Sequence, residues 1–329
     1  MFSESNNGIC CALPDIGQRC FFLQDRSFLP KSQRHLGMTK MKNHLRTIVA
    51  SATLIACAAP AMADVTVQGD YIQIGVNANG SLIDFGSFIG LKYDPSGTGN
   101  FSSPIDFVTP GIPFAFYSIG VTGSSAVAGA GSSSNPFATS TVDLSAGADS
   151  PFVLTKNGSY AGLTFKQVLS FDVDSKVVHS SVTFKNKSAA TVNNVAYGVG
   201  LDPDQDANIG GSTDTNNSIL GQGANASVSA MGILSGYSIT LSNTGGWTAT
   251  TASITDTWET NPYVLSSAAT DSGNGDYTIG LGFQLGNFAV NQEKTISYDY
   301  TISAVPEPGN YAMFLAGLSL LGFMRRRRS

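Results

Sequence analysis

Apolar and polar residues alternate one by one through the middle of this chain, over 163–171, 178–184 and 296–302. A period of two is typical of half-buried antiparallel strands, and no helical stripe of apolar residues occurs between 64 and 304. The pattern predicts an all-β fold, a large antiparallel β-sandwich of about 14 to 18 strands. The candidate strands are 72–76, 81–83, 163–171, 178–184, 192–201 and 296–302.

Two segments interrupt the alternation. Residues 77–80, Asn-Ala-Asn-Gly, are a predicted turn because Asn and Gly tolerate a positive φ. Residues 120–135 are rich in Ser, Gly and Ala, and we interpret them as a mobile loop. The strand rhythm from Asn79 to Asp206 resembles the supersandwich of galactose-mutarotase-like domains.

The charged residues divide the 329-residue chain into three regions. Seven basic residues precede position 64 and four arginines lie next to the C-terminus, whereas 64–304 carries 19 acidic and 7 basic residues, a net charge of −12. The last of the four cysteines is Cys57, so no disulfide framework is expected after it. Basic ends around an acidic middle indicate an exported protein and argue against a nucleic-acid partner.

A signal peptide is predicted at 41–63. Basic residues begin it, and an uncharged, alanine-rich stretch continues to Ala59. Ala61 and Ala63 then satisfy the small-x-small rule for signal peptidase, which makes Asp64 the expected mature N-terminus. The alternative is a short buried helix.

The residues before this signal admit two interpretations. Residues 1–40 show no periodicity and are expected to be a mis-called N-terminal extension, the alternative being a long n-region that is removed with the rest. Inside the signal itself, Leu54-Ile55-Ala56-Cys57 is similar to a bacterial lipobox, in which Cys57 would be lipidated after cleavage before it.

The C-terminal segment 305–329 combines an extended motif, an apolar stretch and a basic run. Two prolines keep the first part extended, and the apolar stretch 309–324 is short for a membrane helix, which usually needs about 20 residues. The arginines would stay cytoplasmic and stop translocation. The motif consists of Val305, Pro306, Glu307, Pro308, Arg325, Arg326, Arg327 and Arg328.

This order of parts resembles a PEP-CTERM sorting signal. The resemblance implies processing by an exosortase, a membrane protease of Gram-negative bacteria that make exopolysaccharide. It also implies a helix held in the inner membrane before processing, and a destination in the cell envelope, on the cell surface or in the extracellular matrix. The alternative is an ordinary single-pass anchor.

An acidic loop follows the predicted strand 192–201. Its candidate ligands for Ca²⁺ are Asp202, Asp204, Asp206 and the amide oxygen of Asn208, because carboxylates at alternate positions of a turn can converge on one hard cation. The loop departs from an EF-hand, which has Gly at position 6 and Glu at position 12. It is more similar to the aspartate-rich loops of extracellular calcium-binding repeats. The alternative is a solvated acidic loop.

Residue types for catalysis are sparse between 64 and 304. His179 is the single histidine and is expected on the polar face of a strand. Glu259 and Glu293 are the only glutamates, and neither lies in a recognisable motif for glycoside hydrolysis. Trp247 and Trp258 could stack on sugar rings, although aromatic residues more often fill β-cores.

The sequence therefore predicts a non-catalytic, exported surface or matrix protein associated with exopolysaccharide or biofilm and stabilised by Ca²⁺. Its expected partners are signal peptidase, exosortase, the inner membrane and exopolysaccharide. The alternatives are a carbohydrate-binding module and, behind it, an uncharacterised hydrolase.

Overall fold

The computed structural model describes residues 64–102, 105–132, 136–146 and 152–304. The predicted extension 1–40, the signal peptide with Ala61 and Ala63, and the sorting segment 305–329 lie outside these ranges. In the described ranges, no helix is both long and apolar enough to cross a membrane.

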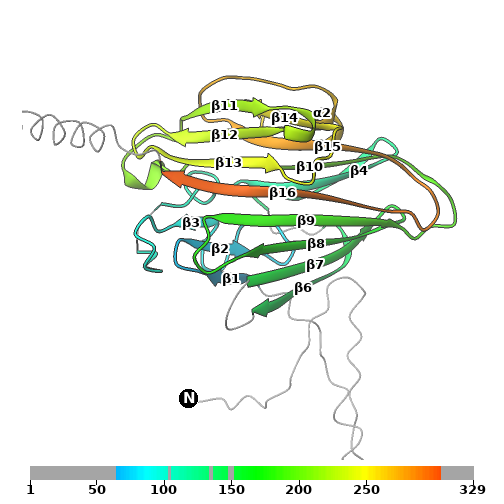
Figure 1. Cartoon of the computed structure of the whole chain (residues 1–329), viewed down its shortest axis with the longest axis horizontal. Coiled ribbons are helices and arrows are strands. Elements are labelled where there is room, and N and C mark those ends of the chain that lie inside the picture. Colours follow the sequence, from blue (N-terminus) through cyan, green and yellow to red (C-terminus); the bar gives the residue numbers. More distant parts are fainter. Residues whose placement is uncertain (1–63, 103–104, 133–135, 147–151, 305–329) are drawn as a thin grey trace, which may run out of the picture. The chain divides into compact units, whose positions relative to one another are not determined.

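The described residues form three antiparallel sheets (Figure 1). The largest has the order β11 (Thr215–Gly221), β12 (Ser227–Gly232), β13 (Tyr237–Asn243), β16 (Glu293–Ala304), β9 (Val177–Asn186), β8 (Leu163–Phe171), β7 (Phe152–Tyr160) and β6 (Ala138–Ala146). The second has the order β14 (Thr250–Thr255), β15 (Thr278–Phe288), β10 (Val192–Leu201), β4 (Ala115–Val121) and β5 (Ser124–Gly129). A small sheet contains β1 (Val65–Gln68), β2 (Ile72–Val76) and β3 (Leu91–Tyr93).

The two larger sheets pack face to face through fully buried aromatic residues. Tyr197 on β10 lies 5.7 Å, ring centroid to ring centroid, from Phe184 on β9, and 6.2 Å from Tyr298 on β16. The hydroxyl groups of Tyr197 and Tyr298 are 2.9 Å apart, so these buried polar atoms satisfy each other. The predicted all-β sandwich is confirmed.

A short helix, α2 (Pro262–Ser267), covers the other face of the second sheet at glycine positions. Asn261 caps the helix by accepting a hydrogen bond from the Tyr263 N–H, and Pro262 begins it. A Cβ on Gly282 of β15 would lie 2.2 Å from the backbone carbonyl carbon of Leu265. Glycine therefore allows the helix to lie directly on the strands.

The structure confirms several predicted strands and corrects two segments. The alternation at 163–171 and the run at 192–201 coincide with β8 and β10. Residues 81–83 are not a strand: the Asn77 side chain accepts hydrogen bonds from the Asn79 and Ser81 N–H groups, so the chain keeps turning, and β2 pairs with β3.

The second correction concerns residues 120–135, which we interpreted as a mobile loop. Strand β5 lies within this range and pairs with β4. The two strands are joined at Thr122 and Gly123, whose φ values are 53° and 86°. Two consecutive positive φ values are typical of the type I′ turn that closes a tight hairpin.

Candidate functional site

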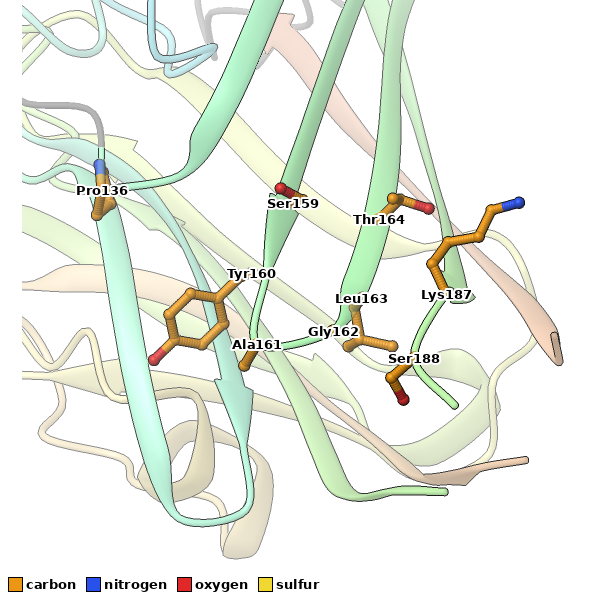
Figure 2. Close-up of a pocket in the computed structure, with 9 residues that line it drawn as sticks. All are labelled: Pro136, Ser159, Tyr160, Ala161, Gly162, Leu163, Thr164, Lys187 and Ser188. Atoms are coloured by element: carbon orange, nitrogen blue, oxygen red, sulfur yellow. The ribbon is translucent and has the colours of Figure 1, made fainter. Parts of the chain in front are cut away.

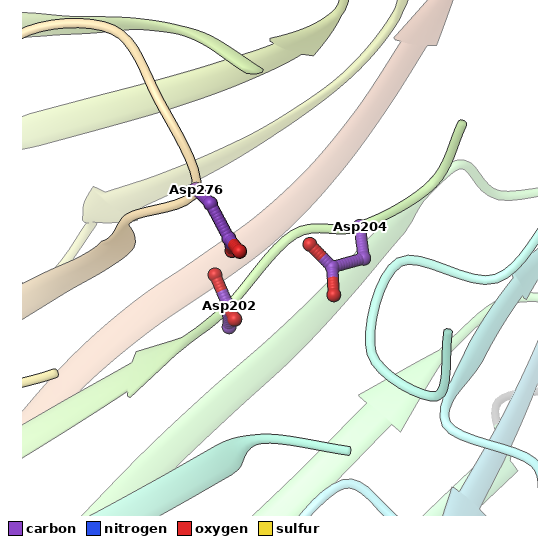
Figure 3. Close-up of side chains that lie close together, drawn as sticks. All are labelled: Asp202, Asp204 and Asp276. Atoms are coloured by element: carbon purple, nitrogen blue, oxygen red, sulfur yellow. The ribbon is translucent and has the colours of Figure 1, made fainter. Parts of the chain in front are cut away.

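Three aspartates gather where β10 ends and β15 begins (Figure 3). Asp202 and Asp204 follow β10, and Asp276 precedes β15. These strands are antiparallel neighbours in which Leu201 is paired with Ile279, so the end of one lies beside the start of the other. The topology thus brings together side chains that are more than 70 residues apart in sequence.

The three carboxyl groups are close together, and four of their six oxygens are buried without a hydrogen-bond partner. One oxygen from each lies within 4.8 Å of the other two. Asp202 and Asp204 are 1% and 2% exposed. Both oxygens of Asp202, Oδ1 of Asp204 and Oδ1 of Asp276 are buried without a hydrogen-bond partner. Such an arrangement can hold a cation or a shared proton.

Burial and mutual repulsion perturb two of these groups. Burial, helped by the negative charge of Asp276, raises the pKa of Asp202 to about 7. Burial and the charges of Asp202 and Asp276 raise the pKa of Asp204 to about 8. Among the described residues, ion pairs within 4.0 Å join His179 to Asp299 and Lys185 to Glu293. No basic side chain of these ion pairs therefore neutralises the aspartate cluster.

Two of the four predicted calcium ligands are directed elsewhere. The Asp206 carboxylate accepts hydrogen bonds from the backbone N–H groups of Leu234 and Ser235, and so connects the acidic loop to the β12–β13 turn. Asn208 lies in a 3₁₀ turn (η1, Ala207–Ile209) and is exposed. The cluster thus contains Asp202 and Asp204 from the predicted set, and Asp276 in addition.

The two tryptophans proposed for sugar stacking are half-buried. Trp247 packs against the main core and donates from Nε1 to the Gln284 carbonyl at 3.0 Å. Trp258 packs against Phe114, with 5.1 Å between ring centroids. Both rings take part in packing, and their role in stacking stays a prediction.

The three candidate acid–base residues lie apart from the aspartate cluster. His179 has a 58% exposed side chain, and its Nδ1 is 2.9 Å from Asp299 on the neighbouring strand β16. Glu259 accepts a hydrogen bond from the Asn261 N–H just before α2. Glu293 forms a half-exposed ion pair with Lys185.

A hollow of about 360 Å³ opens beside the β7–β8 turn (Figure 2). Tyr160 lines it and is held by an edge-on contact with Phe137. Lys187 lines it from the segment after β9; its side chain is exposed and forms no ion pair within 4.0 Å with another described residue. The remaining lining residues are Pro136, Ser159, Ala161, Gly162, Leu163, Thr164 and Ser188.

Sequence reasoning missed Asp276 and the hollow. Asp276 lies in a Gly/Asn-rich turn with no second acid at alternate spacing, so only the pairing of β10 with β15 reveals its role. Tyr160 ends one strand and Lys187 follows another, and neither position carries a local motif.

A family model of the PEP-CTERM protein-sorting motif matches residues 304–328. No curated protein matches the chain. Solved structures with a similar arrangement include a bacterial glucoamylase complexed with acarbose, which is 13% identical with a TM-score of 0.49 over 78% of this chain and 34% of that one. A heparan sulfate lyase mutant from Pedobacter heparinus is 8% identical with a TM-score of 0.40 over 76% and 38%.

A GH36 α-galactosidase from Geobacillus stearothermophilus is 8% identical, with a TM-score of 0.38 over 74% of this chain and 40% of that one. The match to the glucoamylase covers 34% of the length of that enzyme, so this chain spans only about a third of it. The sorting motif at 304–328 confirms the resemblance of the C-terminal residues. The chain thus carries a PEP-CTERM protein-sorting motif at residues 304–328, and this motif supports an exosortase substrate that is exported to the cell envelope or surface.

Proposed function

We propose that the β-sandwich is a non-catalytic protein of the cell surface or extracellular matrix, and that it associates there with exopolysaccharide or biofilm. The observation that carries this proposal is the sorting motif at 304–328. Signal peptidase would release the mature chain after Ala63, and the apolar stretch 309–324 would hold it in the inner membrane until exosortase acts.

The placement of the acid–base residues supports a non-catalytic domain. A catalytic base needs a pocket that positions the substrate within hydrogen-bond reach. His179 instead lies on the open face of the largest sheet, and Glu259 and Glu293 are engaged in a backbone hydrogen bond and a surface ion pair. These contacts give each side chain a structural role.

The matrix role is tested by fractionating two strains that produce the full-length chain, one making exopolysaccharide and the other lacking it. We expect the protein in the matrix fraction of the first strain and in the medium of the second. A variant with Pro306, Glu307 and Pro308 replaced by alanine is expected to stay with the inner membrane in both. Equal matrix retention with and without polysaccharide would contradict the proposal.

The hollow beside the β7–β8 turn favours a second candidate function, direct binding of an acidic polysaccharide. The Tyr160 ring offers an apolar face, the Lys187 ammonium offers a positive charge, and Thr164 and Ser188 offer hydroxyl groups. Sugar recognition uses this combination because a sugar has an apolar face and a polar rim.

This candidate is tested by co-sedimentation with the purified polysaccharide. Tyr160→Ala and Lys187→Ala are each expected to lower the affinity by about tenfold, which corresponds to one contact of 1.4 kcal/mol. Lys166→Ala is the matched control, because Lys166 is exposed on the same sheet but does not line the hollow. Equal losses for Lys166→Ala and Lys187→Ala would show non-specific charge attraction.

A further inference from the structure

We propose that Asp202, Asp204 and Asp276 form a Ca²⁺ site that fastens the end of β10 to the start of β15. This inference goes beyond the proposed matrix role and is independent of it. It also replaces the contiguous loop of four ligands expected from the sequence, because Asp206 is committed to Leu234 and Ser235.

The other four buried aspartates among the described residues each accept hydrogen bonds from backbone N–H groups. Asp106, fully buried, accepts hydrogen bonds from the N–H groups of Gly90, Leu91, Val108 and Thr109. Asp94, 3% exposed, accepts them from Ser96, Thr98 and Asn100. Asp84 and Asp206 are also supplied with N–H donors.

The cluster departs from this rule. Asp202 is only 1% exposed, and neither of its carboxylate oxygens accepts a hydrogen bond. Figure 3 shows its carboxyl group directed towards that of Asp276, with the carboxyl group of Asp204 beside them. A buried carboxylate that accepts no hydrogen bond is costly unless a cation compensates its charge. The unpartnered oxygens of Asp202, Asp204 and Asp276 therefore point to one shared ion.

The chemistry of the donors selects the ion. The three side chains offer oxygen only, which suits hard cations such as Ca²⁺ rather than Zn²⁺. Oxygen atoms up to 4.8 Å apart can lie on opposite sides of one Ca²⁺, since each Ca–O distance is about 2.3 to 2.6 Å. Mg²⁺ requires shorter distances of about 2.0 to 2.1 Å and near-ideal octahedral geometry.

The surroundings hold two of the ligands in place. Thr213 donates from Oγ1 to Oδ2 of Asp276 at 3.1 Å, which leaves Oδ1 directed into the cluster. Gly111 lies against Asp204: a Cβ at this position would be 2.4 Å from Oδ2, and its φ of 69° favours glycine. Second partners of this kind orient ligands towards a metal ion.

The test is calorimetric titration of CaCl₂ into the full-length chain after EGTA treatment, with thermal unfolding measured in parallel. We expect one Ca²⁺ per chain and a rise in Tm with Ca²⁺ concentration. Asp202→Asn and Asp276→Asn should each weaken binding by at least about tenfold, in the range seen when metal coordination is disturbed. MgCl₂ at the same concentration should raise Tm less than CaCl₂.

Two controls separate the loss of a ligand from a folding defect. In EGTA, Asp202→Asn should unfold at or above the Tm of the unmodified chain, because an amide at this buried position cannot carry the negative charge that burial and the neighbouring carboxyl groups disfavour. Asp214→Asn removes an exposed acid from the same loop and should bind Ca²⁺ normally. The proposal is overturned by the absence of both heat and a Tm rise at about 5 mM Ca²⁺, or by equal losses in Asp202→Asn and Asp214→Asn.

Discussion

Replacement of Asp206 by asparagine should destabilise the domain without affecting cation binding. The Asp206 carboxylate accepts hydrogen bonds from the Leu234 and Ser235 N–H groups, and it approaches Gly232 so closely that a Cβ there would lie 2.4 Å from Oδ1. Asparagine keeps one acceptor oxygen but directs an NH₂ group at the second position. The Ser235 N–H also lies 3.2 Å from Oδ2, so an amide oxygen at that position still accepts from both N–H groups, but both hydrogen bonds lose their charge and Ser235 loses its second acceptor.

The expected magnitude follows from these two losses. A hydrogen bond to a charged group contributes about 1.5 to 3 kcal/mol and a neutral one about 0.5 to 1.5 kcal/mol, so each of the two bonds should weaken by about 1 to 1.5 kcal/mol. With the second acceptor of the partly buried Ser235 N–H also lost, we expect a loss of about 2 to 3 kcal/mol in the free energy of unfolding. With a urea slope of about 2 to 3 kcal/mol/M, the midpoint should fall by about 1 M.

The assay is urea unfolding of Asp206→Asn and of the unmodified chain, once with saturating Ca²⁺ and once in EGTA. The difference in midpoint should be equal in the two conditions, and the Ca²⁺ affinity should agree within about twofold, as for independent sites. A destabilisation that vanishes in EGTA, or a lost Ca²⁺ affinity, would refute the reasoning, because Asp206 would then act through the ion.

Two further predictions concern the packing of α2 and the titration of the cluster. Gly282→Ala should lower stability by about 3 kcal/mol, because its Cβ would lie 2.2 Å from the Leu265 backbone; a thermal melt followed by circular dichroism measures this, and an unchanged Tm would contradict the contact. In the folded chain without Ca²⁺, burial raises the pKa of Asp202 to about 7 and that of Asp204 to about 8, from an ordinary value of 3.8. The stability that their protonated forms contribute should therefore be complete below about pH 4. It should be lost as the pH rises through 7 to 8. Urea midpoints at pH 5 and 8.5 check this, and Asp202→Asn should show a smaller pH dependence than the unmodified chain.

The sandwich could be predicted from sequence because its strands bury one face. The alternation at 163–171 gives β8 its five buried positions, and the buried run 195–201 gives most of the central strand β10. The segment 120–135 was misinterpreted because small residues fill β5, so its pairing with β4 leaves no hydrophobic signal. Leu82 and Ile83 are apolar because they enter the core, where both are buried outside any strand.

The candidate site could be predicted only in part. Asp202 and Asp204 follow a strand at alternate positions, and this local spacing indicated a cation. The choice between Asp206 and Asp276 as the third member depends on which backbone N–H groups lie nearby and which strands pair. Contacts between distant segments decide both, and no local pattern in the sequence contains them.

The central claim, that an exosortase sorts this protein, is tested by comparing its location in a producing strain and in the same strain without exosortase. Membrane and surface fractions are probed for the full-length chain. We expect the protein at the cell surface or in the matrix of the first strain, and in the inner membrane of the second. The same surface location in both strains would contradict the account.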